Sequence, residues 1–380
     1  MVEPYRAAVT AYHEANHGLP RRLIVEIVIV RCVMSTQPLI PYTLFVGVDI
    51  AAATATAVWQ LGDASPSRPL TFDQTAAGMR AFQNQLSATA VQPAQTLIVM
   101  EATGSYGMTL ATTLHAADYA VAVINPAQAH AFAKALLKRV KTDPIDAPTL
   151  TRLAAMLHPA PWEPPPAIYH ELVQRLGQRN DLMTVRQQFR NQLHALVQHP
   201  VVVASVRQRL ETLITTLSDE IVVLEAEIAP VLTQDATWAA AAERLQSIPG
   251  VGLLTASWMI VLTLNFRLCP RADAAAAYAG LAPNDYRSGT SVQKRACIGH
   301  TGNRRVRTAL YLATLSGTQH NPILRAMYDR LRAAGKPMKV ARCAVARTLV
   351  RIAWAVVTKE HVFDPTHHHV AGLPVVRGTA

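Results

Sequence analysis

The chain has few cysteines, few acidic residues and no long uncharged apolar segment. Only 4 of its 380 residues are Cys. None of them forms a Cys-x-x-Cys pair, which excludes a zinc ribbon and a disulfide framework and fits a reducing cytoplasm. The apolar run at residues 23–34 is short and contains Glu26 and Arg31, so it predicts neither a membrane span nor a signal peptide. With half of its residues hydrophobic, the chain is expected to fold into two or three domains rather than remain disordered.

The scarcity of acidic residues leaves a large positive excess. There are 25 Asp and Glu against 36 Lys and Arg, a formal net charge of +11. Such an excess favours a polyanionic partner. It is concentrated in residues 285–351, where 14 basic residues face only Asp285 and Asp329. We therefore expect the C-terminal part of the chain to bind nucleic acid.

The N-terminal half has the pattern of an α/β domain. Residues 43–50, 54–61 and 68–72 predict three meandering strands, and helices then alternate with strands, the first helix being capped by Asp73. This order favours a ribonuclease-H-like fold, although a doubly wound sheet gives a similar pattern. Before it, residues 1–40 are expected to form an extension. Its first 33 residues are interpreted either as an accessory helix or as a segment upstream of the true start at Met34.

A proline-rich segment predicts the domain boundary. Residues 159–166 contain five prolines and cannot continue a helix. Beyond it, two long amphipathic patterns turn near residues 199–200 and predict a coiled-coil hairpin suited to dimerisation, or helices that only pack on their own domain. The domains we expect are therefore 41–160, 161–238 and a mainly α-helical 239–363, followed by a tail at 364–380.

Four carboxylates lie at the ends of predicted strands or near the start of a predicted helix, where they can take part in catalysis. Asp49 and Glu101 end predicted strands, and Asp143 and Asp146 lie three residues apart near the start of a helix expected to begin at Pro144. If they converge, their repulsion calls for divalent cations, and an all-oxygen set suits Mg²⁺ or Mn²⁺. Two such ions can clamp the attacking and leaving oxygens of a phosphodiester. Each acid taken alone also has a structural explanation as a cap or turn residue.

Two glycine turns stand before helices in the C-terminal half. The segment IPGVG at residues 248–252 has the form of a helix-hairpin-helix turn, in which Gly250 and Gly252 allow backbone N–H groups to approach a phosphate, or of a plain turn. Residues 299–307 predict a loop that presents amides and guanidinium groups to phosphates. The residues expected to bind nucleic acid there are Gly302, Asn303, Arg304, Arg305 and Arg307.

In combination, these motifs resemble the DEDD transposases of the IS110 family. The four carboxylates match the tetrad of that family's RuvC-like domain. The segments that begin LQSIPG, AYAGLAP and KRACIGH resemble successive blocks of its second, transposase-specific domain. The resemblance covers about residues 43–360. One departure follows Asp49, where AAATAT replaces a more polar stretch, which affects an auxiliary nucleic-acid contact but not the tetrad.

The resemblance implies a DNA transposase or recombinase with a serine nucleophile. The tetrad would hold Mg²⁺, and Ser288 would attack the phosphate to give a phosphoserine link, with Ser291 as the alternative nucleophile. Cations near Ser288 favour its alkoxide, and Arg287, Lys294 and Arg295 surround it in sequence.

The resemblance also implies partners and leaves rivals open. The implied partners are element and target DNA, a non-coding bridge RNA that pairs with both, and further copies of the chain in a dimer or tetramer. The implied location is the prokaryotic cytoplasm at the nucleoid, without a membrane. The alternatives are a metal-dependent nuclease of the Holliday-junction type that uses water, and a non-catalytic nucleic-acid-binding relic.

Overall fold

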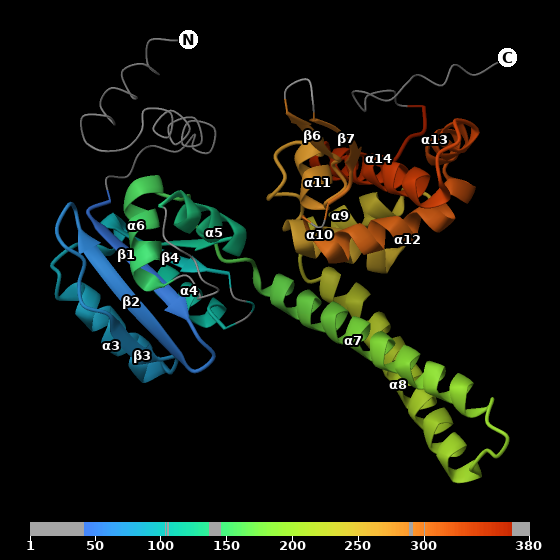
Figure 1. Cartoon of the computed structure of the whole chain (residues 1–380), viewed down its shortest axis with the longest axis horizontal. Helices are drawn as coiled ribbons and strands as arrows, with labels where there is room; N and C mark the ends of the chain where they lie inside the picture. The colour runs from blue at the N-terminus through green and yellow to red at the C-terminus, as the bar shows by residue number, and fades with distance from the viewer. Residues whose placement is uncertain are drawn as a thin grey trace. The chain divides into compact units, whose positions relative to one another are not determined.

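Figure 1 shows the computed structural model of the chain. It describes residues 42–102, 104, 106–136, 146–288, 292–299 and 301–366, with the backbone alone for 284–288 and 292–296. The chain divides into two compact units, residues 1–164 and 165–380, which are described separately. The division falls inside the proline-rich segment. The predicted N-terminal extension, Asp143 and residues 367–380 of the predicted tail lie outside the described residues.

A mixed five-stranded sheet forms the centre of the N-terminal unit, with its strands in the order β3-β2-β1-β4-β5. The β1–β2 and β2–β3 pairs are antiparallel, whereas the β1–β4 and β4–β5 pairs are parallel. The strands are β1 (Leu44–Ile50), β2 (Thr54–Leu61), β3 (Leu70–Asp73), β4 (Thr96–Glu101) and β5 (Ala120–Ile124). This antiparallel meander followed by parallel strands is a ribonuclease-H-like arrangement and confirms the predicted α/β fold class.

Helices cover both faces of the sheet (Figure 1). They are α3 (Ala76–Ser87), α4 (Met108–His115), α5 (Pro126–Ala135) and α6 (Ala147–Leu157), with a short 3-10 turn at η1 (Pro93–Gln95). Side chains alternate along β1, so Val46 and Val48 pack with α3 and α4. Phe45 instead packs with α5 and α6 on the opposite face.

Two predicted helix starts are wrong, one by two residues and the other by three. Asp73 is the last residue of β3, and the cap of α3 is Thr75, whose hydroxyl accepts a hydrogen bond from the Gly78 N–H at 3.2 Å. Helix α6 was expected to begin at Pro144, but its N-cap is Asp146 and its first residue is Ala147. Asp and Thr are both good caps, so the sequence alone does not choose between neighbouring candidates.

The second unit begins with the predicted helical hairpin. Helix α7 (Ala167–Leu196) and helix α8 (Ala204–Leu232) pack along each other. Their ends nearest the rest of the unit enter a common core through Ile168, Leu172 and Ile228. The hairpin and the C-terminal helices therefore share one hydrophobic core.

The remainder of the second unit is mainly α-helical. It comprises α9 (Ala236–Gln246), α10 (Leu253–Thr263), α11 (Ala272–Tyr278), the strands β6 (Asn284–Ser288) and β7 (Val292–Cys297), α12 (Arg304–His320), α13 (Pro322–Ala333) and α14 (Met338–Thr358). Helix α14 supplies a long buried run to the core, including Leu349, Val350 and Ala353. In the part of the chain that the structure describes, no helix combines the length and apolarity needed to cross a membrane.

Candidate functional site

The parallel pairing of β1 with β4 places Asp49 beside Glu101. Val48 lies opposite Met100, so each acid follows a paired position at the same carboxyl edge of the sheet. Phe45 of β1 and Val99 of β4 face α5 and α6. Side chains alternate along a strand, so Asp49 and Glu101 lie on that same face.

The two carboxyl groups share an electrostatic environment with a third. Burial is the main cause that raises the pKa of Asp49 above its usual value, and the charge of Asp146 raises it further. Burial also raises the pKa of Glu101, with the charge of Asp49 adding to the effect. A hydrogen bond from the Ile50 backbone lowers the pKa of Asp49, but the effects of burial and of the like charge are larger together. Three of the four predicted acids are thus brought together.

Asp146 reaches this edge of the sheet as the N-cap of α6. It accepts hydrogen bonds from the Thr149 backbone N–H, at 3.1 Å, and from the Thr149 hydroxyl. An N-cap carboxylate also stands at the positive end of the helix dipole. The side chain therefore has a capping role, and Asp146 as a residue is exposed.

Helix α6 is fixed against β1 by an unusually close crossing. The Gly47 N–H donates to the Thr151 hydroxyl oxygen at 3.1 Å. That hydroxyl lies 2.8 Å from the Val58 carbonyl oxygen and 2.9 Å from the Ala147 carbonyl oxygen. A Cβ on Gly47 would collide with the backbone of Ala147 and Thr151. Glycine at this position is what lets the helix carry Asp146 so near the strand.

The sequence analysis missed His130. This exposed residue lies on α5, which starts directly after β5, and its charge lowers the pKa of Glu101 against the larger effect of burial. Glu101 pairs with Ile124 at the end of β5. The helix that follows that strand therefore begins at the same edge as the acids. A histidine in its first turns is the signal that was available in the sequence.

The described carboxylates do not by themselves form a metal centre. Among the residues that the structure describes, no group of three or more His, Cys, Asp or Glu could hold a metal ion. The donor chemistry of Asp49, Glu101 and Asp146 nevertheless fits a hard divalent cation. All three offer oxygen, and their mutual repulsion is the kind that such a cation relieves. Asp143, the fourth predicted ligand, lies outside the described residues.

The predicted nucleophile lies in a short hairpin of the second unit. Ser288 is the last residue of β6 and pairs with Val292 of β7. Arg287 belongs to β6, whereas Lys294 and Arg295 belong to β7. Ser291, the alternative nucleophile, lies outside the described residues. The hairpin and the carboxylates belong to different units, so a composite site stays a prediction.

The predicted phosphate-binding loop at residues 299–307 packs tightly against the end of α11. Gly302 has a φ of +84°, and a Cβ there would collide with the backbone of Gly280. The Asn303 N–H donates to the Tyr278 carbonyl oxygen at 2.7 Å, and Arg307 Nη1 donates to the Thr301 carbonyl oxygen at 2.9 Å. Close packing of two chain segments is a sufficient reason for glycine here.

The start of α12 is already capped. The Asn303 side-chain oxygen accepts hydrogen bonds from the Arg305 N–H at 3.0 Å and the Val306 N–H at 3.2 Å. An anion at this helix end would compete with that cap. Arg304 and Arg305, the predicted phosphate ligands, are exposed, and the guanidinium of Arg305 lies 5.3 Å from the ring centre of Trp258. This cation–π contact holds the arginine in a defined position.

The two glycines of the turn at residues 248–252 differ in their surroundings. Gly250 has a φ of +100°, and a Cβ there would collide with Gly317 of α12. Gly252 is exposed and is the N-cap of α10, without a side-chain hydrogen bond and with open space around its Cβ position. Helix packing therefore explains Gly250, and Gly252 is the position accessible to a phosphate.

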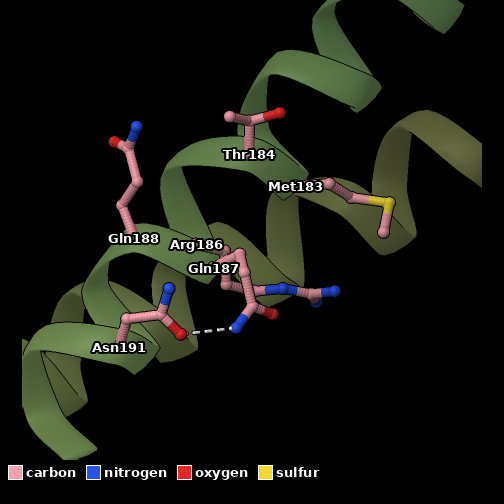
Figure 2. Close-up of a pocket in the computed structure, with 6 residues that line it drawn as sticks. All are labelled: Met183, Thr184, Arg186, Gln187, Gln188 and Asn191. Atoms are coloured by element: carbon pink, nitrogen blue, oxygen red, sulfur yellow. Dashed lines mark hydrogen bonds between the residues drawn. The ribbon is translucent and has the colours of Figure 1, made fainter.

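A shallow hollow lies on the outer surface of the helical hairpin (Figure 2). It encloses about 420 Å³, and all of its lining residues come from α7: Met183, Thr184, Arg186, Gln187, Gln188 and Asn191. Gln187 Nε2 donates to Asn191 Oδ1 at 2.8 Å. The lining contains no carboxylate. This hollow therefore offers none of the chemistry of Asp49, Glu101 and Asp146, which we call the acidic edge.

Comparison with known proteins matches both halves of the chain to transposases. Residues 46–200 match the DEDD transposases of IS110, and residues 242–329 match the transposase family of IS116, IS110 and IS902. The "Pilin gene-inverting protein" of Moraxella lacunata is 30% identical over 272 residues, which are 71% of this chain and 83% of that protein. Its counterpart in Moraxella bovis is 28% identical over 85% of this chain and 98% of its own length.

A third relative carries the insertion-element name itself. The "Insertion element IS110 uncharacterized 43.6 kDa protein" of Streptomyces coelicolor is 38% identical over 112 residues, 29% of this chain and 27% of that protein. Together with the ribonuclease-H-like sheet and its acidic edge, these matches define a DNA transposase of the recombinase type. Within that class, the chain belongs to the IS110 family.

Proposed function

We propose that the protein cuts and rejoins DNA with Mg²⁺, or Mn²⁺ in its place, held by Asp49, Glu101, Asp143 and Asp146. The observation that carries this proposal is the mutual charge effect among the three described acids, which lie at one edge of the sheet. A divalent cation would neutralise these charges and polarise a DNA phosphate. The partial burial of Asp49 and Glu101 limits competition from water for the same oxygens.

Ser288 is the proposed nucleophile. Its hydroxyl loses a proton, its oxygen forms a bond to phosphorus, and the bond from phosphorus to a deoxyribose oxygen breaks, with that oxygen taking up a proton. The resulting phosphoserine conserves the bond energy, so a DNA hydroxyl can reverse the step without ATP. Arg287, Lys294 and Arg295 in the same hairpin support the assignment, because neighbouring cations favour an alkoxide.

The proposed partners are DNA, a non-coding bridge RNA and further copies of the chain. Two relatives are named for gene inversion, which requires both cutting and rejoining. The basic C-terminal half supports a nucleic-acid contact, with its 14 Lys and Arg in residues 285–351. We propose a dimer or tetramer, assembled through the α7/α8 hairpin, that acts at the nucleoid. Mass measurement of the full-length protein with and without element-derived RNA tests the assembly.

The test of the chemistry is covalent trapping on labelled element-end DNA. The wild-type protein with Mg²⁺ and element-derived RNA should leave a protein–DNA adduct after denaturation. Ser288→Ala should abolish both the adduct and cleavage, whereas Ser291→Ala should retain them. Asp49→Asn should abolish cleavage while leaving DNA binding intact. Cleavage by Ser288→Ala without an adduct would establish a nuclease that uses water, and cleavage unaffected by Asp49→Asn would exclude the acidic edge.

A further inference from the structure

Three arginines lie around α11 in the second unit. Arg347 Nη2 is 3.9 Å and Arg351 Nε is 3.5 Å from the same oxygen of Asp273, in the first turn of α11. At the other end of this helix, Arg307 of α12 contacts Gly280, where an added Cβ would collide with its guanidinium. Guanidinium groups from α12 and α14 thus stand at both ends of one short helix.

The three arginines are linked along α14. Arg307 of α12 packs at Gly280, and its positive charge lowers the pKa of Cys343 on α14 against the larger effect of burial. Cys343, Arg347 and Arg351 follow one another at intervals of four residues, so they occupy one face of the helix about 6 Å apart along its axis. Arg347 and Arg351 of this face, together with Arg307 at the Gly280 end of α11, are called the α14 arginine row.

Arg347 makes little use of its donors within the protein. Its ion pair with Asp273 spans 3.9 Å, and among the residues that the structure describes its buried Nε atom has no hydrogen-bond partner. The side chain is 39% exposed and that of Asp273 is 67% exposed. Ion pairs of this exposed kind add little to stability, because water screens them. Fastening α11 to α14 is therefore a weak explanation for this arginine.

Asp273 has the features of a temporary partner. It is an exposed carboxylate that faces two guanidinium groups at once, at distances longer than a good charge-assisted hydrogen bond. A phosphate has the same charge sign and more acceptor oxygens, and it suits the planar fork of arginine.

We propose that the α14 arginine row binds the phosphodiester backbone of a nucleic-acid strand, with Arg347 as its principal contact and Asp273 as the group that the phosphate displaces. The proposal rests on the proposed action on nucleic acid and adds a surface to it, since Arg347, Arg351 and Asp273 lie outside the glycine loops and the serine hairpin. Binding through the backbone carries no sequence preference.

The test measures affinity of the full-length protein for a DNA duplex and for an RNA strand of equal length, by fluorescence anisotropy from about 50 to about 200 mM salt. Arg347→Ala should weaken binding several-fold and reduce the slope of log affinity against log salt by about 0.9 on DNA or about 0.7 on RNA. Asp273→Asn should strengthen binding. Arg330→Ala removes the same charge from an exposed site on α13 and should change affinity little.

Each outcome decides the proposal. Opposite shifts in Arg347→Ala and Asp273→Asn support it, and the polymer on which they appear identifies the strand as DNA or RNA. The proposal would be overturned if Arg347→Ala binds nucleic acid as tightly as wild type, or if Arg330→Ala weakens binding as much as Arg347→Ala does. It would also be overturned if both Arg347→Ala and Asp273→Asn weaken binding. Cleavage of element-end DNA by the wild-type protein, measured with Mg²⁺ and element-derived RNA, separates the two proposals. Its absence contradicts the proposed function, whereas its presence beside unchanged Arg347→Ala binding contradicts only the α14 arginine row.

Discussion

The backbone N–H of Gly47 donates a hydrogen bond to the Thr151 hydroxyl at 3.1 Å, in the middle of the face where α6 crosses β1. Asp49 lies two residues after Gly47, and Asp146 caps the helix five residues before Thr151. The separation of these two acids therefore depends on how closely the helix approaches the strand. The distance between these acids is therefore set by a contact between α6 and β1 in which no acidic residue takes part.

Gly47→Ala should disturb this edge without touching a carboxylate. The new Cβ would collide with the backbone of Ala147 and Thr151, which cannot rotate away as a side chain can. Overpacking of this kind costs about 1–3 kcal/mol, and cleavage should fall with the displacement of Asp146. Urea unfolding and a cleavage assay check both effects. Gly177→Ala is the control, because Gly177 lies inside α7 with open space around it and should gain about 0.5–1 kcal/mol.

The hydroxyl of Thr151 can be tested apart from its volume. Thr151→Val removes the acceptor for the Gly47 N–H and leaves that buried group unpaired, which costs about 1–3 kcal/mol. Thr151→Ser keeps the hydroxyl and should lose less. The difference between the two free energies of unfolding measures the hydrogen bond. A loss from Thr151→Ser as large as that from Thr151→Val would show that this hydrogen bond is not the main contribution of the side chain.

Asp146 has two roles that substitution can separate. Its capping hydrogen bonds need an oxygen but no charge, and Ser caps a helix about as well as Asp. Asp146→Ser should therefore unfold within roughly 0.5 kcal/mol of wild type and lose Mg²⁺-dependent cleavage. Asp146→Ala should lose cleavage and also about 1 kcal/mol of stability. Cleavage retained by Asp146→Ser would remove this residue from the proposed metal site.

Asp49 should destabilise the metal-free protein at neutral pH. Its folded-state pKa is raised, mainly by burial and further by Asp146. The folded state therefore holds the proton more tightly than the unfolded chain, and this contribution to stability is lost as pH rises through the folded-state pKa. Asp49→Asn should accordingly raise the melting temperature in chelator at pH ~7, whereas Asp63→Asn, at an exposed turn, should not.

Magnesium should reverse that comparison. Added Mg²⁺ should raise the melting temperature of wild type more than that of Asp49→Asn, because a ligand stabilises the state that binds it. Calorimetric scans with and without Mg²⁺ measure both differences. Equal Mg²⁺ responses in the two proteins would contradict a role for Asp49 in holding the cation.

The sequence predicted the acidic edge because its signals are local. Short apolar runs predicted β1 and β4, and an acid directly after each run placed Asp49 and Glu101 at strand ends. The Gly47–Thr151 contact and the position of His130 were not predictable in this way. They depend on which helix crosses which strand, and residues 104 apart in the chain leave no periodic trace.

The glycines of the second unit show the same limit. A glycine before a helix has the same pattern whether its freedom serves a phosphate or a neighbouring backbone. Gly250 meets Gly317, and Gly302 meets Gly280, so packing accounts for both, whereas Gly252 remains open. Only the tertiary structure distinguishes these cases, because the partner backbone comes from a distant part of the chain.

The register of the α7/α8 hairpin should depend on the ion pair between Arg179 and Glu225. Arg179 Nε and Nη2 donate to Glu225 Oε1 at 2.7 and 2.5 Å, and their side chains are only 18% and 35% exposed. Arg179→Glu should cost about 1.5–3 kcal/mol, the range for hydrogen bonds to charged groups, and the double variant with Glu225→Arg should recover most of it. Urea unfolding of the two single variants and the double variant gives the coupling energy. Arg207→Glu, which breaks an exposed pair with Glu211 within α8, should change stability much less. A double variant no more stable than Arg179→Glu would show that helix packing, and not this pair, sets the register.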